Sequence, residues 1–450
     1  MLFQSLYQSE SDIYFIQCIF ELEGLNTNYW YKAWHTVISR YDSLRASFMW
    51  EGLDEPVQII HKEIKLSWVE EDWRKQTNQK ERLQELIQSE RKKGFDLSKA
   101  PLMRWNLIKI SNDRYYFIWN MHHVLIDGWC GPIILGEVTD VYKSLINDEV
   151  LKLKARRPYR DYISWLLRQD QGRAKEYWKE ELLGAVPTRL ADKQIAESDE
   201  SGECILTLDI KDTNLLNNYA KSLGVTVNTV LQGIWGVLLS KYTRQDDVVF
   251  GVTVSGRNID LPGVEDMVGI FINTLPMRIK FRPSETLKEL LKRLQIQMSE
   301  AQSYGYIPLS TIQSLQSERN LFDNIFIYEN YPLTVKPNIG KNRLLIKAVI
   351  EKTEYAITIL IVPGNTIKIK MYYYKKYFSK PEMEEIYKYL RSLIISVCNN
   401  KCQYIGNLSL ADKNKQGSLI EWNRTDNNIY QKSNYFSRFS LIFTLSKKTL

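Results

Sequence analysis

The sequence predicts a mixed α/β protein built from two related lobes. Its 450 residues are too many for one ordinary core and suit two domains of about 200 residues each. Strand-like apolar runs and helical stripes alternate in both halves of the chain. A polar, irregular stretch at 184–204 separates the halves. We therefore expect a first lobe over 1–183, an inter-lobe linker over 184–204 and a second lobe over 205–400.

The first half starts with a β-rich run, "YFIQCIFELEG", and then a helix in "NYWYKAWHTVISRY", which Asn26 or Thr27 can cap. A strand "PVQIIH", a charged helix around 79–93 and the strands "LMRWNLIKI" and "RYYFIWNM" follow. The segment "DGWCGPIILGEVTDVYKSLIND" starts another helix. The apolar stripes of the first and last of these helices are Trp30, Trp34, Val37, Ile38 and Tyr41, and Ile134, Val138, Val141, Tyr142 and Leu145.

The second half repeats this alternation. It predicts a strand "CILTLDI", helices across 213–242, strands "DVVFGVTVS" and "GIFINTLPMRI", and a helix that opens on a capping box from Thr286 to Glu289. Four strands follow, "NIFIYENY", "LLIKAVI", "YAITILIV" and "TIKIKMYYY", the last two joined through the hairpin signal "PGN". A helix near 380–397 closes the lobe.

Composition excludes several classes of protein. The net charge is only +7, and basic and acidic residues interleave as on solvated helix faces, so we expect no nucleic-acid partner. The five cysteines are scattered without a CxxC pair, which argues against a zinc site or a disulfide framework. No apolar run approaches the roughly 18–20 residues of a membrane span. We expect a cytoplasmic chain with no membrane partner.

The stretch "MHHVLIDGW" (121–129) is the strongest chemical signal, because it holds two of the four histidines. It lies where a predicted strand ends and a helix begins, a position at which loops often carry chemistry. A histidine near neutral pKa is the natural proton acceptor at cellular pH. The residues leave three interpretations open: a catalytic base, a structural histidine, and a metal ligand. The metal is the poorest, because adjacent ligands are geometrically awkward and no third His or Cys is near, so we expect none.

This stretch resembles the core HHxxxDG motif of condensation domains of non-ribosomal peptide synthetases, which other acyltransferases of the superfamily share. Further stretches resemble motifs of that family in the same order: "RYDSLRASF" (40–48), "YRDYISW" (159–165), "VGIFINTLPMR" (268–278) and "SERNLFDNIFIYENYP". "GVTVSGRN" and 259–267 resemble the segment that bridges the lobes. The resemblance implies two chloramphenicol-acetyltransferase-like lobes in a V-shaped pseudo-dimer, with the active site between them.

The resemblance also implies roles for individual residues. His123 is the catalytic histidine and His122 its structural neighbour. Asp127 is a structural anion that pairs with a buried arginine, with Arg278 as first choice and Arg319 as second. Gly128 permits a tight turn before the helix. Arg40 and Arg45 shape the site or the loop beneath it, and Trp129 and Asn273 are secondary candidates. For each of these arginines an ordinary fold-level salt bridge is the alternative.

The function implied is peptide-bond formation between an aminoacyl or peptidyl thioester on an upstream carrier protein and the amine of an aminoacyl thioester on a downstream one. The partners are two carrier proteins and an adenylation domain. The phosphopantetheine arms belong to the carriers, so the chain itself binds no cofactor. The amino acids joined are not encoded here. "HHVLIDGWCGPII" with "VSGRN" resembles the subtype that takes an L-configured donor.

Two other functions stay open: a free-standing acyltransferase on a soluble amine, and an inactive fragment or recruitment platform with the same fold. An epimerising relative is disfavoured because Trp129 directly follows Gly128. At the ends, "MLFQSLY" falls inside the family's first motif, and 401–450 resembles the lead-in to an adenylation domain until about 432. We expect a domain truncated at both ends, with a dispensable tail from Lys432.

Overall fold

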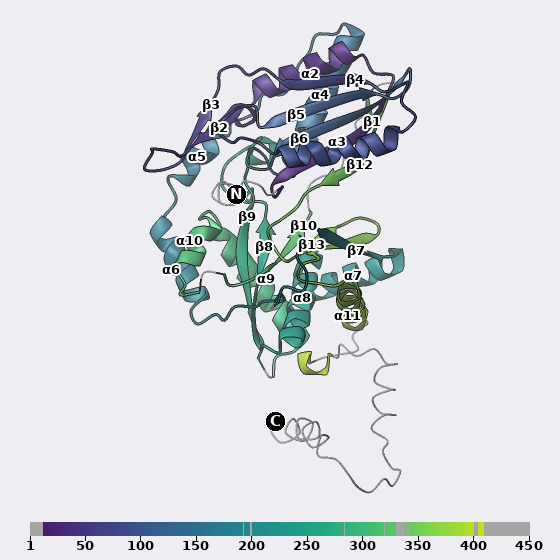
Figure 1. Cartoon of the computed structure of the whole chain (residues 1–450). Helices are drawn as coiled ribbons and strands as arrows, with labels where there is room; N and C mark the ends of the chain where they lie inside the picture. The colour runs from purple at the N-terminus through teal and green to yellow at the C-terminus, as the bar shows by residue number, and fades with distance from the viewer. Residues whose placement is uncertain are drawn as a thin grey trace.

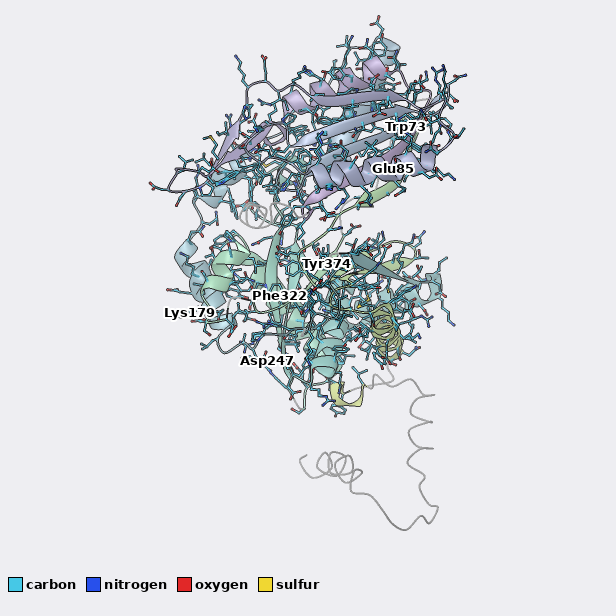
Figure 2. The ribbon with its side chains drawn as sticks, in the orientation of Figure 1. Trp73, Glu85, Lys179, Asp247, Phe322 and Tyr374 are labelled. Carbon is cyan, nitrogen blue, oxygen red and sulfur yellow. The ribbon has the colours of Figure 1, made fainter. Side chains whose placement is uncertain are left out.

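The computed structural model describes residues 12–408 apart from 192, 199, 283, 319, 330–337, 340–341 and 400–403. Figure 1 shows two lobes, one above the other, each built on a sheet with helices against it. Both sheets have six strands, and a separate two-stranded sheet belongs to the first lobe. The side chains in Figure 2 fill both lobes, with Trp73 in the first and Phe322 in the second.

In the sheet of the first lobe, the central strand β6 (Arg114–His122) ends at the histidine doublet. The neighbouring strands β1 (Phe15–Glu23) and β5 (Met103–Lys109) both pair antiparallel with β6. At one edge of the sheet, β4 (Ser67–Asp72) pairs parallel with β5. The small sheet pairs β2 (Ala46–Met49) with β3 (Val57–Ile60). In spatial order the strands are β11 (Asn338–Ile339), β12 (Asn342–Ile350), β1 (Phe15–Glu23), β6 (Arg114–His122), β5 (Met103–Lys109) and β4 (Ser67–Asp72).

Helices cover both faces of this sheet. On one face α2 (Thr27–Arg40) and α4 (Cys130–Asn147) bury an aromatic core, in which Trp34 contacts Trp105 and Trp119. On the other face α3 (Gln79–Lys93) buries Ile87 against the sheet. The side chain of Asn26 caps α2 by accepting the hydrogen bond of the Tyr29 N–H, which is the capping that the sequence predicts. This core anchors the strand end and the helix start between which the doublet lies.

The second lobe repeats the plan with a mixed sheet. Its central pairs β8–β10 and β10–β13 are parallel, whereas the outer pairs are antiparallel. The predicted hairpin through "PGN" is β13–β14. In spatial order the strands are β7 (Ser201–Leu208), β14 (Ile367–Tyr374), β13 (Ile357–Val362), β10 (Asn324–Tyr328), β8 (Asp247–Val254) and β9 (Asn273–Lys280).

The helix α8 forms the centre of the second core, since its residues from Thr229 to Leu239 are all buried. The predicted capping box at Thr286 and Glu289 begins α9. Among the described residues no single helix is long and apolar enough to cross a bilayer; α7 and α8 meet that test only as a pair bent by 99°. The remaining helices are α5 (Arg160–Leu166), α6 (Gln171–Glu181), α7 (Ile210–Leu223), α8 (Val227–Thr243), α9 (Leu287–Ser303), α10 (Leu309–Ser314), α11 (Lys380–Cys398) and the 3₁₀ turns η1 (Asp42–Arg45), η2 (Val264–Asp266) and η3 (Ile405–Asn407).

Three placements differ from the expected division of the chain. The strand expected in "LLIKAVI" forms as β12, but it pairs with β1 in the first lobe's sheet and not with the second. Strand β7 begins at Ser201, inside the expected linker. Leu408, expected in the tail, is buried in the second core. Residues 1–11 and 409–450 lie outside the described residues, and with them the expected truncation and the tail from Lys432 that was expected to be dispensable.

Candidate active site

The histidine doublet lies at the end of a buried strand. His122 is the last residue of β6 and pairs with Phe15 of β1. The N–H of His123 donates to the carbonyl of Tyr14, 2.8 Å away. Tyr14 has a φ of +66°, a left-handed conformation that a bulky side chain rarely adopts. The loop then runs to Cys130, where α4 begins, so the strand-to-helix position predicted for the doublet is confirmed.

The two imidazoles have different surroundings. The Nδ1 atom of His122 accepts the N–H of Val124 at 3.1 Å, and the ring lies near the rings of Tyr14 and Phe95. Burial, together with the neighbouring charge of His123, lowers the pKa of His122 to about 3. His122 is therefore neutral at cellular pH and serves the packing of the loop.

His123 faces a carboxylate. Its side chain is 6% exposed, and Nε2 lies 3.1 Å from Oε1 of Glu351, whose side chain is 42% exposed. Burial alone would lower the pKa of His123, but the charge of Glu351 and its hydrogen bond outweigh burial and raise that pKa. The same pairing lowers the pKa of Glu351 against the opposing effect of burial. Nε2 of His123 thus meets a charged group directly.

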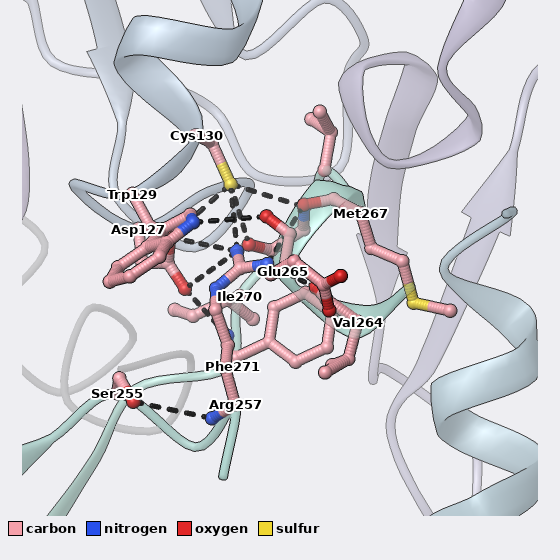
Figure 3. A network of polar contacts seen from close by, with 12 residues as sticks. Asp127, Trp129, Cys130, Ser255, Arg257, Val264, Glu265, Met267, Ile270 and Phe271 are labelled. Atoms are coloured by element: carbon pink, nitrogen blue, oxygen red, sulfur yellow. Dashed lines mark hydrogen bonds and ion pairs between the residues drawn. The ribbon is translucent and has the colours of Figure 1, made fainter. Parts of the chain in front are cut away.

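Asp127 is the anchor of the loop. Its Oδ1 lies 3.2 Å from Nη2 of Arg257, and the two side chains are 0% and 4% exposed. Its Oδ2 accepts the N–H of Phe271 at 3.0 Å, and Oδ1 also accepts the thiol of Cys130 at 3.2 Å. Figure 3 shows Asp127 and the thiol of Cys130 beside the guanidinium of Arg257. The carboxylate of Asp127 is therefore buried, paired with an arginine and hydrogen-bonded to the main chain.

Arg257 belongs to the chain that crosses from the second lobe. It follows β8, donates to the carbonyls of Val264 and Met267 at 2.6 and 3.0 Å, and its guanidinium lies 4.0 Å from the ring centre of Phe271. Trp129 joins the same contact, because its indole N–H donates to the carbonyl of Glu265 at 3.0 Å. The crossing chain 255–271 is thus fastened to the loop after the doublet.

The expected partner of Asp127 was wrong. Arg278 pairs with Asp247 at 2.7 Å and donates to the carbonyls of Glu181 and Leu183, all in the second lobe's neighbourhood. Asp247 lies low in the second lobe in Figure 2, away from the first. As a residue of strand β9, Arg278 is held by the sheet, whereas the loop after β8 is free to reach Asp127. The second choice, Arg319, lies outside the described residues.

The side chains of the other predicted arginines and of Asn273 form their hydrogen bonds and ion pairs away from the doublet. Arg40 pairs with the buried Glu137 at 3.2 Å and also donates to the carbonyl of Lys154. Arg45 pairs with Asp42 at 2.7 Å and donates to the carbonyls of His61 and Lys62 beside the β2–β3 sheet. Asn273 donates to the carbonyls of Gly305 and Ile307 in the second lobe. Gly128 lies exposed in the turn before α4.

Two residues of this site escaped the sequence reasoning. Arg257 lies in the bridging stretch "GVTVSGRN", so its segment was expected near the site but its role was not. Glu351 follows a strand that was expected in the other sheet, and no motif marks it. No group of three or more His, Cys, Asp or Glu side chains within the described ranges is placed to hold a metal ion.

The comparison with known protein families shows the family to which the chain belongs. The model of the family described as "Condensation domain" matches residues 1–420. The chain belongs to the condensation-domain family. Condensation domains of non-ribosomal peptide synthetases are acyltransferases that form amide bonds, so the predicted family and enzyme class are confirmed.

Relatives of this condensation domain are long synthetases. The chain is 37% identical over 441 residues to one of the linear gramicidin synthase proteins of Brevibacillus parabrevis, covering 94% of the chain and 6% of the synthase. It is 34% identical to bacitracin synthase 1 of Bacillus licheniformis, covering 93% of the chain and 8% of the synthase. The chain thus spans less than a tenth of the length of these relatives.

Solved condensation domains share the fold. The first condensation domain of the calcium-dependent antibiotic synthetase superposes with a TM-score of 0.75 at 15% identity, covering 91% of this chain and 97% of that one. A four-domain nonribosomal peptide synthetase bound to AMP and glycine gives 0.77 at 18% identity, covering 99% of this chain and 36% of that one. The expected fold class, with two α/β lobes of this type, is confirmed.

Proposed function

We propose that this condensation domain joins an aminoacyl or peptidyl thioester on an upstream carrier protein to the amine of an aminoacyl thioester on a downstream carrier. The observation that carries the proposal is the placement of His123. Its buried ring presents Nε2 to a half-exposed carboxylate, on a loop locked by the buried pair of Asp127 and Arg257. Carrier-bound phosphopantetheine arms supply both substrates, and an adenylation domain loads them.

The chemistry needs little beyond alignment and proton handling. The thioester is already activated, so the amine attacks its carbonyl carbon directly and the thiolate leaves from the tetrahedral intermediate. Starting from an ammonium group, the reaction yields an amide and a thiol and releases one proton overall. Holding both arms in register supplies much of the rate, and His123 at the reacting nitrogen handles the proton.

The experiment uses two loaded carrier proteins with the purified chain. Dipeptidyl-carrier, detected by mass spectrometry, is the expected product. His123→Ala should lower its rate by about 10²–10⁴, the usual contribution of a general acid–base group, while the melting temperature stays that of the wild type. His35→Ala is the matched control, because His35 is exposed on α2. Product at the wild-type rate from His123→Ala would remove His123 from the chemistry.

The donor and acceptor classes are tested in the same assay. We propose an L-configured donor residue, supported by the resemblance of "HHVLIDGWCGPII" and "VSGRN" to that subtype. A carrier loaded with the D-donor should react more slowly than its L-counterpart, and the reverse order would contradict the subtype. A soluble amine that replaces the downstream carrier without loss of rate would favour the free-standing acyltransferase.

A further inference from the structure

Glu351 belongs to the second half of the chain but lies beside the histidine doublet of the first half. It directly follows β12, whose Ile350 pairs with Gln17 of β1. β1 in turn pairs with β6, which ends at the doublet, so Glu351 and His123 lie across the same end of three neighbouring strands. In the register of these three strands, Oε1 of Glu351 lies 3.1 Å from Nε2 of His123.

The residues after Glu351 are fastened on both sides. The ammonium group of Lys352 lies 2.9 Å from the carboxylate of Asp12. The carboxylate of Glu354 accepts the hydroxyl of Tyr14 at 2.9 Å. The carbonyl of Thr353 accepts the hydroxyl of Tyr374, at 2.6 Å, from the second lobe's sheet. The segment that follows Glu351 is thus held by contacts to both lobes, and these contacts keep the Glu351 carboxylate beside His123.

We propose that Glu351 is a positioning residue of this active site, which orients the His123 ring through Nε2 and fixes where the ring carries its proton. A carboxylate without a proton can only accept a hydrogen bond. The contact therefore places a proton on Nε2, between the ring and Oε1. With Glu351 as acceptor, the ring is held through Nε2, and in the neutral ring Nδ1 is the nitrogen left to accept a proton.

The proposal rests on the proposed function and deepens it. One proton leaves overall when an ammonium group and a thioester become an amide and a thiol. An imidazolium paired with a carboxylate keeps its charge in a buried setting, where an unpaired one would lose it to desolvation. Glu351 is thereby the group that sets the pH at which His123 changes protonation.

Among the described residues, the other titratable groups that interact with this pair lie on β6, the loop after it, β1 and β14. His122 ends β6 and Asp127 lies on the loop after it, and the charge of Asp127 acts on His123 more weakly than that of Glu351. On β1 the thiol of Cys18 feels the charge of Glu351, as does the phenol of Tyr372 on β14. The pKa of each of these two groups is raised, so both stay neutral near pH 7.

The direct test reads His123 by NMR in the full chain, labelled with ¹³C at histidine Cε1. Only four histidines contribute signals, and His123→Ala identifies the one in question. Glu351→Gln should lower the titration midpoint of His123 by about 1–3 pH units, because an opposite charge within hydrogen-bond reach is lost. Glu354→Gln is the matched control: it sits three residues away, and its amide oxygen can still accept the Tyr14 hydroxyl. An unchanged midpoint in Glu351→Gln would overturn the proposal.

Kinetics give a second readout that a purely structural role would not move. In Glu351→Gln, the limb of the pH–rate profile that depends on His123 should move to lower pH, with a larger effect on kcat than on KM, and Glu351→Asp should restore most of both. If Glu351→Gln does not fold, Glu351→Ala is titrated in its place with the same expectation. Absence of condensation by the wild type would contradict the proposed function, whereas the NMR midpoint judges Glu351 independently.

Discussion

At the scale of single residues, Asp127 and Arg257 form the best-buried ion pair of the site, with side chains 0% and 4% exposed. The guanidinium also satisfies two main-chain carbonyls, and the carboxylate accepts a backbone N–H. Charges removed from water are tolerated only with such partners. The loop that carries the doublet is therefore only as stable as this pair.

Arg257→Ala should lower the free energy of unfolding by about 3–5 kcal/mol, because Asp127 would stay buried without its counter-charge. Denaturant unfolding measures this loss. Arg74→Ala is the matched control: its pair with Asp72 is 43% and 52% exposed, so water screens the pair and its removal should change the free energy of unfolding far less. Equal losses in the two variants would show that the Asp127 pair does not anchor the loop.

His122 makes stability depend on pH in a defined direction. Its folded-state pKa of about 3 lies below the unfolded value of about 6.5. The unfolded chain therefore binds more protons between these values, and this contribution to stability falls as the pH drops from about 6.5 towards 3. Between pH 7 and pH 5 the loss from this residue is about 2 kcal/mol.

His122→Asn should remove that part of the pH dependence while keeping a side-chain acceptor for the Val124 N–H. Denaturant unfolding at pH 7 and pH 5 gives the difference for each variant. The difference should shrink in His122→Asn and stay unchanged in His35→Asn, since His35 is exposed on α2. A wild-type difference in both variants would mean that His122 is not held neutral.

Residue types in the motif predicted the location of the site but not its pairings. The stretch "MHHVLIDGW" indicated a strand end and a loop before a helix, and both are found. The aspartate expected to pair with a buried arginine does lie in a buried ion pair. The arginine was chosen from a strand motif, whereas the actual partner comes from a loop 130 residues away. Such a pairing depends on how the crossing chain folds back, which no local pattern encodes.

At the scale of elements, the second residue of the crossing chain 255–271 is a glycine whose conformation and surroundings leave no room for a side chain. Gly256 has a φ of +65°, and a Cβ there would lie 1.9 Å from the carbonyl oxygen of Phe271. The next residue is Arg257, and Phe271 donates its N–H to Asp127. The close approach at Gly256 therefore sets the position of the whole contact with the doublet loop.

Gly256→Ala should destabilise the protein by more than the about 1–2 kcal/mol of left-handed strain alone, because the new methyl group also displaces backbone. Gly52→Ala is the matched control: Gly52 has a φ of +71°, and a Cβ added there would meet nothing within 4 Å, so strain is its only cost. Thermal and denaturant unfolding compare the two. A Gly256→Ala loss that matches Gly52→Ala would show that the crossing chain shifts freely.

Elements with strong local signals were predictable. The capping box at Thr286 and the apolar stripe behind it begin α9 as expected, and the helix expected near 380–397 is Lys380–Cys398. Strand β12 was predicted to form but not to pair with β1. Alternation along a strand shows that one face is buried, not which sheet buries it.

At the scale of the whole molecule, residues from the second half of the chain complete the first lobe. The second half contributes strand β12 to the first lobe's sheet, and it contributes Arg257 as the partner of Asp127 on the loop after the doublet. The fragment 1–183 alone would expose the edge of β1 and leave Asp127 without its arginine. It should therefore fail to give a cooperative melt by circular dichroism, whereas the full chain does. A cooperative melt of the fragment near the temperature of the full chain would contradict this interdependence.

The pairing of β12 with the first lobe's sheet also determines which segments of the chain can be exchanged when synthetases are recombined. A junction anywhere between β7 and β10 would join a native His123 to a foreign Glu351, since the two come from opposite halves. Such a hybrid could keep both sheets and still lose the match between ring and carboxylate. For engineering of assembly lines, the smallest transferable unit is the pair of lobes, and a graft of either half has to carry its counterpart across the junction.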